Sequence, residues 1–192
     1  MNVFVPTLKR SSLRYCLKSL RKAGCYDPTV VKNTQWTDAC NFMADSADGD
    51  WFLRVDDDMF LCKWAIKFFN MLIAKYSEVV VISCSLFDWR TKTPIRGIKA
   101  YHSATAKRLR FFSDKNGRVD RLYASRISDA GMSVMVLDHV VGVHAQTEDD
   151  EQRRSWLARG EKDIYKFKSL SGGSFNYREQ MEYLEKIQEP NV

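Results

Sequence analysis

The architecture of this chain can be built outward from the stretch Trp51-Phe52-Leu53-Arg54-Val55-Asp56-Asp57-Asp58. Its apolar and aromatic start is typical of a buried strand, and three carboxylates follow directly. Because residues two apart in an extended chain point to the same side, we expect Asp56 and Asp58 to face one point and Asp57 to turn away. Converging carboxylates repel each other unless a cation lies between them, and Mg²⁺ and Mn²⁺ prefer oxygen ligands. The sequence therefore predicts a divalent metal site or, as the alternative, an exposed acidic turn.

Strand and helix patterns alternate on the N-terminal side of this stretch. Short apolar runs predict strands at residues 2–5 and 29–31, and helices are expected at about 13–23 and 37–47. This alternation indicates parallel βαβ units and hence an α/β fold. Open sheets of this class bind ligands beyond the carboxyl ends of their strands, where the three carboxylates would lie.

The C-terminal side continues with a strongly amphipathic segment, whose apolar positions from Phe60 to Tyr76 recur at helical spacing. Residues 88–118 lack clear periodicity and are expected to form loops with one or two short strands. The remaining expected elements are a strand at 79–84, a helix at 120–130, strands at 133–137 and 140–144 around a turn, and a last helix at about 177–189.

Length and composition limit the class of protein. A chain of 192 residues, 45% of them hydrophobic and 12% aromatic, is long enough for one domain with a real core, which excludes a disordered chain. No apolar run of membrane-spanning length and no signal peptide is recognisable, so we expect a cytoplasmic protein without a transmembrane segment. The net charge of +6 suits a polyanionic partner such as a nucleotide diphosphate, a membrane surface or nucleic acid. The five scattered cysteines are expected to be reduced packing thiols.

A set of motifs follows in a fixed order along residues 2–145. They are the turn Pro6-Thr7-Leu8-Lys9-Arg10 after the first strand, Gly24, Asn41, Gly49-Asp50 before the three Asp residues, and the set Asp120, Arg126, Gly131 and His144. In this order they resemble the nucleotide-sugar-dependent glycosyltransferases of the GT-A fold, and among these the family 2 type. The second strand departs from the family pattern, because it ends in Lys32-Asn33-Thr34 and not in acidic residues, which leaves the donor base open.

The resemblance implies a single GT-A-like domain over residues 1–192, an α/β fold with a central, mostly parallel sheet flanked by helices. Its nucleotide-binding half would span about residues 1–100 and its acceptor and base half about 101–145, with a C-terminal loop and helix at 146–192. Such a domain can also form part of a longer polypeptide.

The resemblance also implies an activity, the transfer of a sugar from a nucleotide-diphosphate donor to a hydroxyl of a saccharide or glycoprotein acceptor, with inversion. A UDP-sugar is the expected donor. Asp120 is expected to be the general base, and Asp56, Asp58 and His144 are expected to bind Mn²⁺ or Mg²⁺. The expected nucleotide contacts are Pro6, Thr7, Arg10, Asn33, Asp56 and Asp57.

Simpler explanations stay open for several of these residues. Thr7 and Arg10 could form an ordinary turn, Asp120 could be a carboxylate favoured at a helix N-terminus, and His144 could be a surface or core residue at a strand end. Two other activities also stay open: a metal-dependent nucleotidyltransferase or phosphohydrolase, and a basic module that binds nucleic acid. The spread of the positive charge along the chain argues against nucleic acid as a partner.

Overall fold

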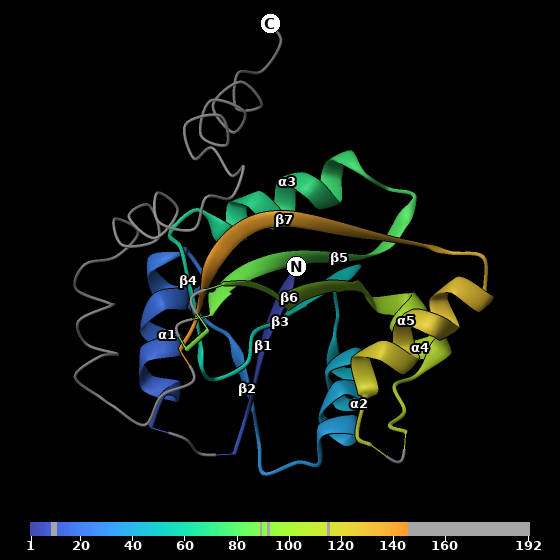
Figure 1. Cartoon of the computed structure of the whole chain (residues 1–192), viewed down its shortest axis with the longest axis horizontal. Helices are drawn as coiled ribbons and strands as arrows, with labels where there is room; N and C mark the ends of the chain where they lie inside the picture. Colours follow the sequence, from blue (N-terminus) through green and yellow to red (C-terminus); the bar gives the residue numbers. More distant parts are fainter. Residues whose placement is uncertain (9–10, 89, 92, 115, 146–192) are drawn as a thin grey trace, which may run out of the picture.

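The computed structural model of the chain describes residues 1–8, 11–88, 90, 91, 93–114 and 116–145. Within these residues the backbone forms a seven-stranded sheet, in the order β2-β1-β3-β6-β5-β7-β4, with helices on both sides (Figure 1). The strands are β1 (Asn2–Thr7), β2 (Thr29–Lys32), β3 (Trp51–Arg54), β4 (Met59–Leu61), β5 (Val79–Asp88), β6 (Pro94–His102) and β7 (Ser133–His144). The helices are α1 (Leu13–Lys22), α2 (Trp36–Ser46), α3 (Ala65–Lys75), α4 (Ser103–Leu109) and α5 (Val119–Asp129). None of these described helices has the length and apolarity that crossing a membrane requires.

Most strands of the sheet point in the same direction. β1 pairs in parallel with β2 and β3, and β5 pairs in parallel with β7. β6 is antiparallel to both β3 and β5, and β4 is antiparallel to β7. Among the described strands only β6 and β4 therefore run in reverse, and the expected α/β fold with a mostly parallel sheet is confirmed.

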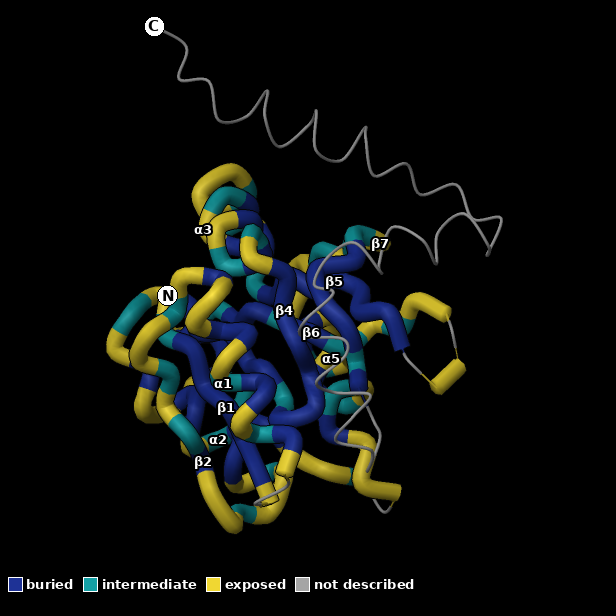
Figure 2. The backbone as a smooth tube through the Cα atoms, turned by 90° about the vertical axis from the view of Figure 1, so that its left-hand side faces the viewer, coloured by how far each residue is buried: buried dark blue, intermediate teal, exposed yellow. Residues whose placement is uncertain are grey.

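Helices cover both faces of the sheet, so the strands are apolar on both sides. α1 and α3 pack on one face, against Val3, Val5 and Leu53, while α2, α4 and α5 pack on the other, against Phe4 and Phe52. The residues of β1 and β3 thus alternate between the two cores, as an extended chain requires. Figure 2 shows the strands as the buried interior, with exposed residues gathered on helices and loops. These two cores hold the strand ends from which the loops of the functional site project.

The segment directly after the three Asp residues differs from the sequence-based expectation. Met59–Leu61 form the short strand β4, not the first turn of a helix, and α3 begins only at Ala65. A short apolar run fits a strand and a buried helix equally well. Pairing with β7 decides between them here, because Met59 lies opposite His144. This pairing brings His144 beside the carboxylate loop.

The expectation of loops with one or two short strands at residues 88–118 is right about a strand but misses its length and a helix. This segment holds the nine-residue strand β6 and the helix α4. Charged side chains such as Arg96 and Lys99 hide the strand pattern of β6, although its second half is largely buried. The expected helix at 177–189, like all of residues 146–192, lies outside the described residues.

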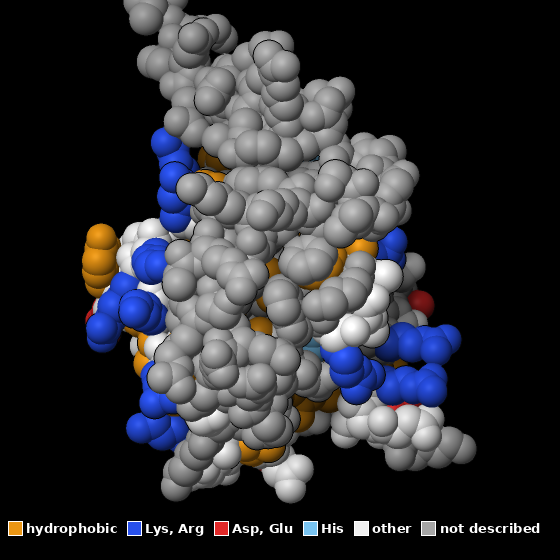
Figure 3. All heavy atoms as spheres, turned by 60° about the vertical axis from the view of Figure 1, so that its left-hand side comes forward, with side chains coloured by type: hydrophobic (Ala, Val, Ile, Leu, Met, Phe, Trp, Pro, Cys, Tyr) orange, Lys and Arg blue, Asp and Glu red, His pale blue; other side chains and the backbone are white. Residues whose placement is uncertain are grey.

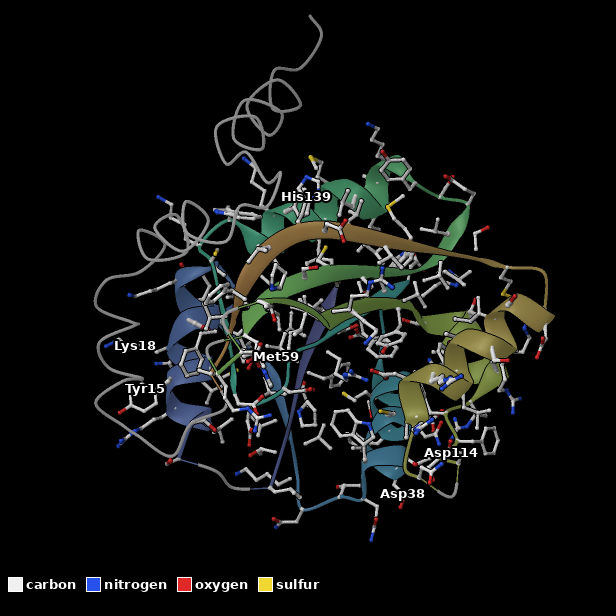
Figure 4. All side chains as sticks on the ribbon, viewed as in Figure 1. Tyr15, Lys18, Asp38, Met59, Asp114 and His139 are labelled. Atoms are coloured by element: carbon white, nitrogen blue, oxygen red, sulfur yellow. The ribbon has the colours of Figure 1, made fainter. Side chains whose placement is uncertain are left out.

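β7 is one continuous strand, whereas the sequence suggested two strands around a turn at Asp138-His139. The pairing of β7 with β5 shifts register at these two residues, which form a bulge. The His139 ring packs on Phe68 of α3, with the ring centroids 5.3 Å apart (Figure 4). Packing of His139 on α3 therefore favours a continuous strand over a turn at Asp138-His139.

The close approach of β4 to β7 requires glycine at position 142. A Cβ atom there would lie 2.5 Å from the Phe60 carbonyl oxygen and 3.1 Å from Leu61 Cα, and these backbone atoms are held by strand pairing. We expect Gly142→Ala to lower the free energy of unfolding by about 1–3 kcal/mol, measured by urea denaturation. Gly49→Ala is the matched control, because a Cβ there meets no atom closer than 3.4 Å. Equal losses in the two variants would contradict this account.

Candidate functional site

A cavity of about 730 Å³ opens at the carboxyl ends of β1, β2 and β3, a size typical of sites for small molecules. This is the position expected for the ligand of an open α/β sheet. Residues predicted from the sequence line it together: Pro6, Thr7, Asn33, Asp56, Asp57, Asp58 and His144. Asp120 is not among the lining residues, and Arg10 lies outside the described part of the chain.

The three carboxylates lie in a turn and not on the strand itself. β3 ends at Arg54, and the Met59 N–H donates a hydrogen bond of 2.9 Å to the Asp56 carbonyl. The alternation of an extended chain therefore stops before these residues, and all three Asp residues line the cavity. The expectation that Asp57 turns away is wrong, since Asp57 accepts a hydrogen bond of 2.5 Å from the Thr7 hydroxyl.

Asp56 has a buried oxygen atom without a hydrogen-bond partner among the described residues. This Oδ1 atom lies 3.5 Å from Arg54 Nε. Burial raises the pKa of Asp56 to about 6, against the opposing effect of the Arg54 cation. A buried, unsatisfied oxygen is costly, so a ligand that supplies a hydroxyl or a cation at this point would be stabilised.

His144 lies next to Asp58 at the end of β7. Its Nε2 is 3.6 Å from Asp58 Oδ1, and its Nδ1 is 2.7 Å from Asp88 Oδ2. The two carboxylates, Asp58 first, raise the pKa of His144 to about 9 against the effect of its own burial. The Ala145 N–H donates to the Asp58 carbonyl at 2.8 Å, which ties the end of β7 to the carboxylate loop. Sequence reasoning misses Asp88, although Asp88 is the last residue of the apolar strand β5 and the three Asp residues likewise follow an apolar strand, β3.

Asp58 and His144 fit part of a divalent metal site. Two neighbouring ligands of one Mg²⁺ ion lie roughly 3 Å apart when each bond is about 2.0–2.1 Å, which is near the 3.6 Å between Asp58 Oδ1 and His144 Nε2. Across the described residues, no group of three or more His, Cys, Asp or Glu side chains is arranged to hold a metal. Mg²⁺ commonly takes one or two carboxylates and completes its shell with water and substrate phosphates. The residues present therefore suit an ion that binds together with a phosphate ligand.

Asp120, the predicted general base, belongs to a separate ionic cluster. Its carboxylate accepts hydrogen bonds from Arg54 Nη1 and Nη2, at 2.7 and 2.9 Å, and from Lys99 Nζ at 2.7 Å. Arg54 and Lys99 lie directly opposite each other on β3 and β6, so these like charges need a counter-ion. Burial would raise the pKa of Asp120, but Arg54 and Lys99 outweigh it and hold this pKa well below its usual range. An arginine inside an apolar strand is the sequence signal that could have revealed the cluster.

Trp36 also lines the cavity, at the start of α2, and was not expected from the sequence. The Arg54 guanidinium lies 4.8 Å from the centre of the Trp36 ring, so this ring links the ionic cluster to the cavity wall. The loop before Trp36 is held by Asn33, whose N–H donates to the Thr7 carbonyl at 3.2 Å. Asn33 has a φ of 53°, in the left-handed region that asparagine tolerates better than most residues. The loop after β2 and the first residue of α2 thus contribute an asparagine and a tryptophan to the cavity lining.

Comparison with known proteins identifies the class of fold. No protein-family model matches the chain, and neither does any curated protein. Solved structures do match. TarS residues 1–349 from S. aureus gives a TM-score of 0.58 at 15% identity, over 96% of this chain and 78% of that one. The mannosyltransferase PcManGT from Pyrobaculum calidifontis, in complex with GDP-Man and Mn²⁺, gives 0.59 at 16% identity, over 91% of this chain and 65% of that one.

Nucleotidyltransferases share this architecture. The 2-C-methyl-D-erythritol 4-phosphate cytidylyltransferase from Thermus thermophilus gives a TM-score of 0.53 at 10% identity, over 82% of this chain and 97% of that one. Identities this low establish the fold alone. The chain has the GT-A-like fold of nucleotide-diphospho-sugar transferases, as its sequence motifs suggested, while its assignment to the family 2 type stays a prediction.

The ionic cluster makes Asp120 important for stability whatever its catalytic role. We expect Asp120→Asn to leave Arg54 and Lys99 facing each other without a counter-ion and to lower the free energy of unfolding by at least ~2 kcal/mol. The Asp120 side chain is 34% exposed, so solvent screens part of the effect. Asp129→Asn, at the exposed end of the same helix, is the control and should change stability by less than about 0.5 kcal/mol. Urea denaturation of both variants measures the difference, and equal stabilities would refute the counter-ion role.

Proposed function

We propose that this protein is a metal-dependent glycosyltransferase that moves a sugar from a nucleotide-diphosphate donor, a UDP-sugar, to an acceptor hydroxyl with inversion. One observation carries the proposal. At the carboxyl ends of the strands, Asp58 and His144 lie 3.6 Å apart, beside a buried Asp56 oxygen that has no hydrogen-bond partner among the described residues. The acceptor is a saccharide or glycoprotein hydroxyl, and the expected location of the protein is the cytoplasm.

In this proposal Asp58 and His144 hold Mn²⁺ or Mg²⁺, which neutralises the charge that develops on the departing nucleoside diphosphate. Asp56 accepts a hydrogen bond from a ribose hydroxyl or from a water of the same ion through the exposed part of its carboxylate, which is 26% exposed as a whole. Thr7 holds Asp57 in place through its hydroxyl. Arg10, at the end of the predicted nucleotide-binding turn, is proposed to contact the diphosphate, because a guanidinium suits phosphate geometry. The mannosyltransferase of similar fold that was solved with GDP-Man and Mn²⁺ supports a metal of this kind.

The donor base is proposed to lie between the loop after β2 and the end of β1. Pro6, Val31 and Trp36 supply apolar wall there, and an indole offers a flat surface for stacking. Asn33 and Gln35 add side-chain amides, which can donate and accept hydrogen bonds. Amides can therefore take over the recognition of the base that acidic residues provide in the family pattern.

Asp120 stays the proposed general base, with one added requirement. A base works best when its pKa is near the working pH, and the contacts with Arg54 and Lys99 keep the pKa of Asp120 far lower. Binding of the substrates must therefore weaken one of these contacts before Asp120 can take a proton from the acceptor. Lys99 is the partner with the simpler contact, a single hydrogen bond at 2.7 Å.

Removing the carboxylate next to His144 tests the metal proposal. Asp58→Ala should abolish Mn²⁺-dependent binding of UDP, measured by isothermal titration calorimetry, and leave the thermal unfolding temperature within a few degrees of wild type. Asp38→Ala is the matched control, since Asp38 is exposed on α2 and outside the cavity lining (Figure 4). An unchanged UDP affinity in Asp58→Ala would remove the basis of the assignment.

The pH dependence of transfer tests the role of Asp120. Lys99 favours the ionised form of Asp120 in the free protein, so Lys99→Met should raise the pKa of Asp120 and move the acidic limb of kcat/KM to higher pH. Asp120→Asn should bind donor normally and lose at least about two orders of magnitude in kcat. If the acidic limb stays in place in Lys99→Met, the base is another group.

The shared fold of the cytidylyltransferase supports one alternative, a metal-dependent nucleotidyltransferase or phosphohydrolase. Product analysis separates the activities, because a glycosyltransferase releases a nucleoside diphosphate and the alternatives release pyrophosphate or inorganic phosphate. Nucleic-acid binding has less support. The Lys and Arg residues are spread along the sequence and not clustered in one run, and Figure 3 shows such side chains on both sides of the view.

A further inference from the structure

The end of β5 places a buried carboxylate behind His144. Asp88 is only 5% exposed, and both of its oxygens are engaged. Oδ2 lies 2.7 Å from His144 Nδ1. Oδ1 accepts hydrogen bonds from the Thr91 N–H at 2.7 Å and from the Thr91 hydroxyl at 3.0 Å. The carboxylate is therefore fixed from one side by the connection to β6 and faces the imidazole from the other.

Strand pairing sets this geometry before any ligand binds. Asp88 and His144 are register partners on the parallel strands β5 and β7. The Asp88 N–H donates to the Thr93 carbonyl at 2.9 Å, and the hydroxyls of Thr91 and Thr93 lie 2.8 Å apart. The carboxylate cannot turn without breaking its bonds to Thr91 and His144, and the ring cannot turn without losing its bond to Asp88.

A carboxylate can only accept a hydrogen bond, so His144 must carry a hydrogen on Nδ1. The nitrogen that faces Asp58 is then Nε2. We propose that Asp88 is a positioning residue, which fixes the orientation and tautomer of His144 so that Nε2 is presented to a divalent cation shared with Asp58. This inference rests on the proposed function, because it assigns a new residue to the metal site of that function. Histidines that bind metals commonly donate their other ring N–H to a carboxylate in this way.

If Asp88 only capped the connection to β6, Asp88→Asn would leave metal binding unchanged. The positioning role predicts that this variant binds the metal less tightly. In that variant the amide oxygen can still accept from Thr91, and the NH₂ group then points at His144 and donates to Nδ1. The ring hydrogen is thereby forced onto Nε2, which blocks metal binding. An amide in place of a carboxylate behind a histidine is known to select the wrong tautomer. The substitution thus preserves the turn and removes only the positioning effect.

The experiment is a Mn²⁺ titration of the full-length protein by calorimetry, in the presence of UDP. We expect Asp88→Asn and Asp88→Ala each to weaken Mn²⁺ binding by about 10–100-fold, with the unfolding temperature of Asp88→Asn close to that of wild type. Asp114→Asn is the control. Asp114 caps its own turn through bonds from the Asn116 and Arg118 N–H groups, and it lies beside α5, far from Met59, which pairs with His144 (Figure 4).

A second readout reports the tautomer directly. The chain has three histidines, so the ring nitrogens of His144 can be assigned by ¹⁵N NMR on the Mg²⁺-loaded protein. Wild type should show a hydrogen on Nδ1, and Asp88→Asn should show it on Nε2. Normal Mn²⁺ affinity in Asp88→Asn, or a drop equal to that of Asp114→Asn, overturns the positioning role while the metal site stands. Absence of Mn²⁺ binding in the wild-type protein overturns the proposed function, and this inference with it.

Discussion

Three carboxylates in a largely buried loop impose the main physical constraint on this structure. Asp57 and Asp58 are 4% and 6% exposed, and burial strengthens the repulsion between neighbouring charges. The fold answers by giving each carboxylate a different neighbour from a different strand: a hydroxyl from β1, an imidazole from β7 and a guanidinium from β3. The charge balance of the loop therefore depends on the positions of these three strands. Moving one strand would leave one carboxylate without its neighbour.

Arg54 connects the two halves of the candidate site. It lies near Asp56 in the cavity, binds Asp120 through two hydrogen bonds and packs on the Trp36 ring. One buried cation thus contacts the carboxylate proposed to bind the donor and the carboxylate proposed to activate the acceptor. A change in the charge of either carboxylate alters the electrostatic energy of the other through this shared side chain.

The sequence predicts the first 55 residues well, because each strand and helix there has its own local pattern. It fails where the deciding contact is distant in sequence. Met59–Leu61 become a strand only because residues more than 80 positions later pair with them, and the bulge at Asp138 depends on a neighbouring strand. The candidate site shows the same contrast between local patterns and distant contacts. The acidic triplet is visible as a motif, whereas the partnerships of Asp88 with His144 and of Asp120 with Arg54 exist only in three dimensions.

The reversed strand β6 has a consequence for how the molecule assembles. It is the seam between the parallel strands β2-β1-β3 on one side and the parallel pair β5-β7, with the reversed strand β4 at its edge, on the other. The first group is complete in sequence by Arg54. The edge of β3 stays unpaired until residues 94–102 have been synthesised and pair with it as β6. An unpaired strand edge invites contact with other chains, and late, long-range pairing slows folding. The nascent protein therefore passes through a period in which β3, the strand that leads into the acidic loop, has an unpaired edge open to other chains.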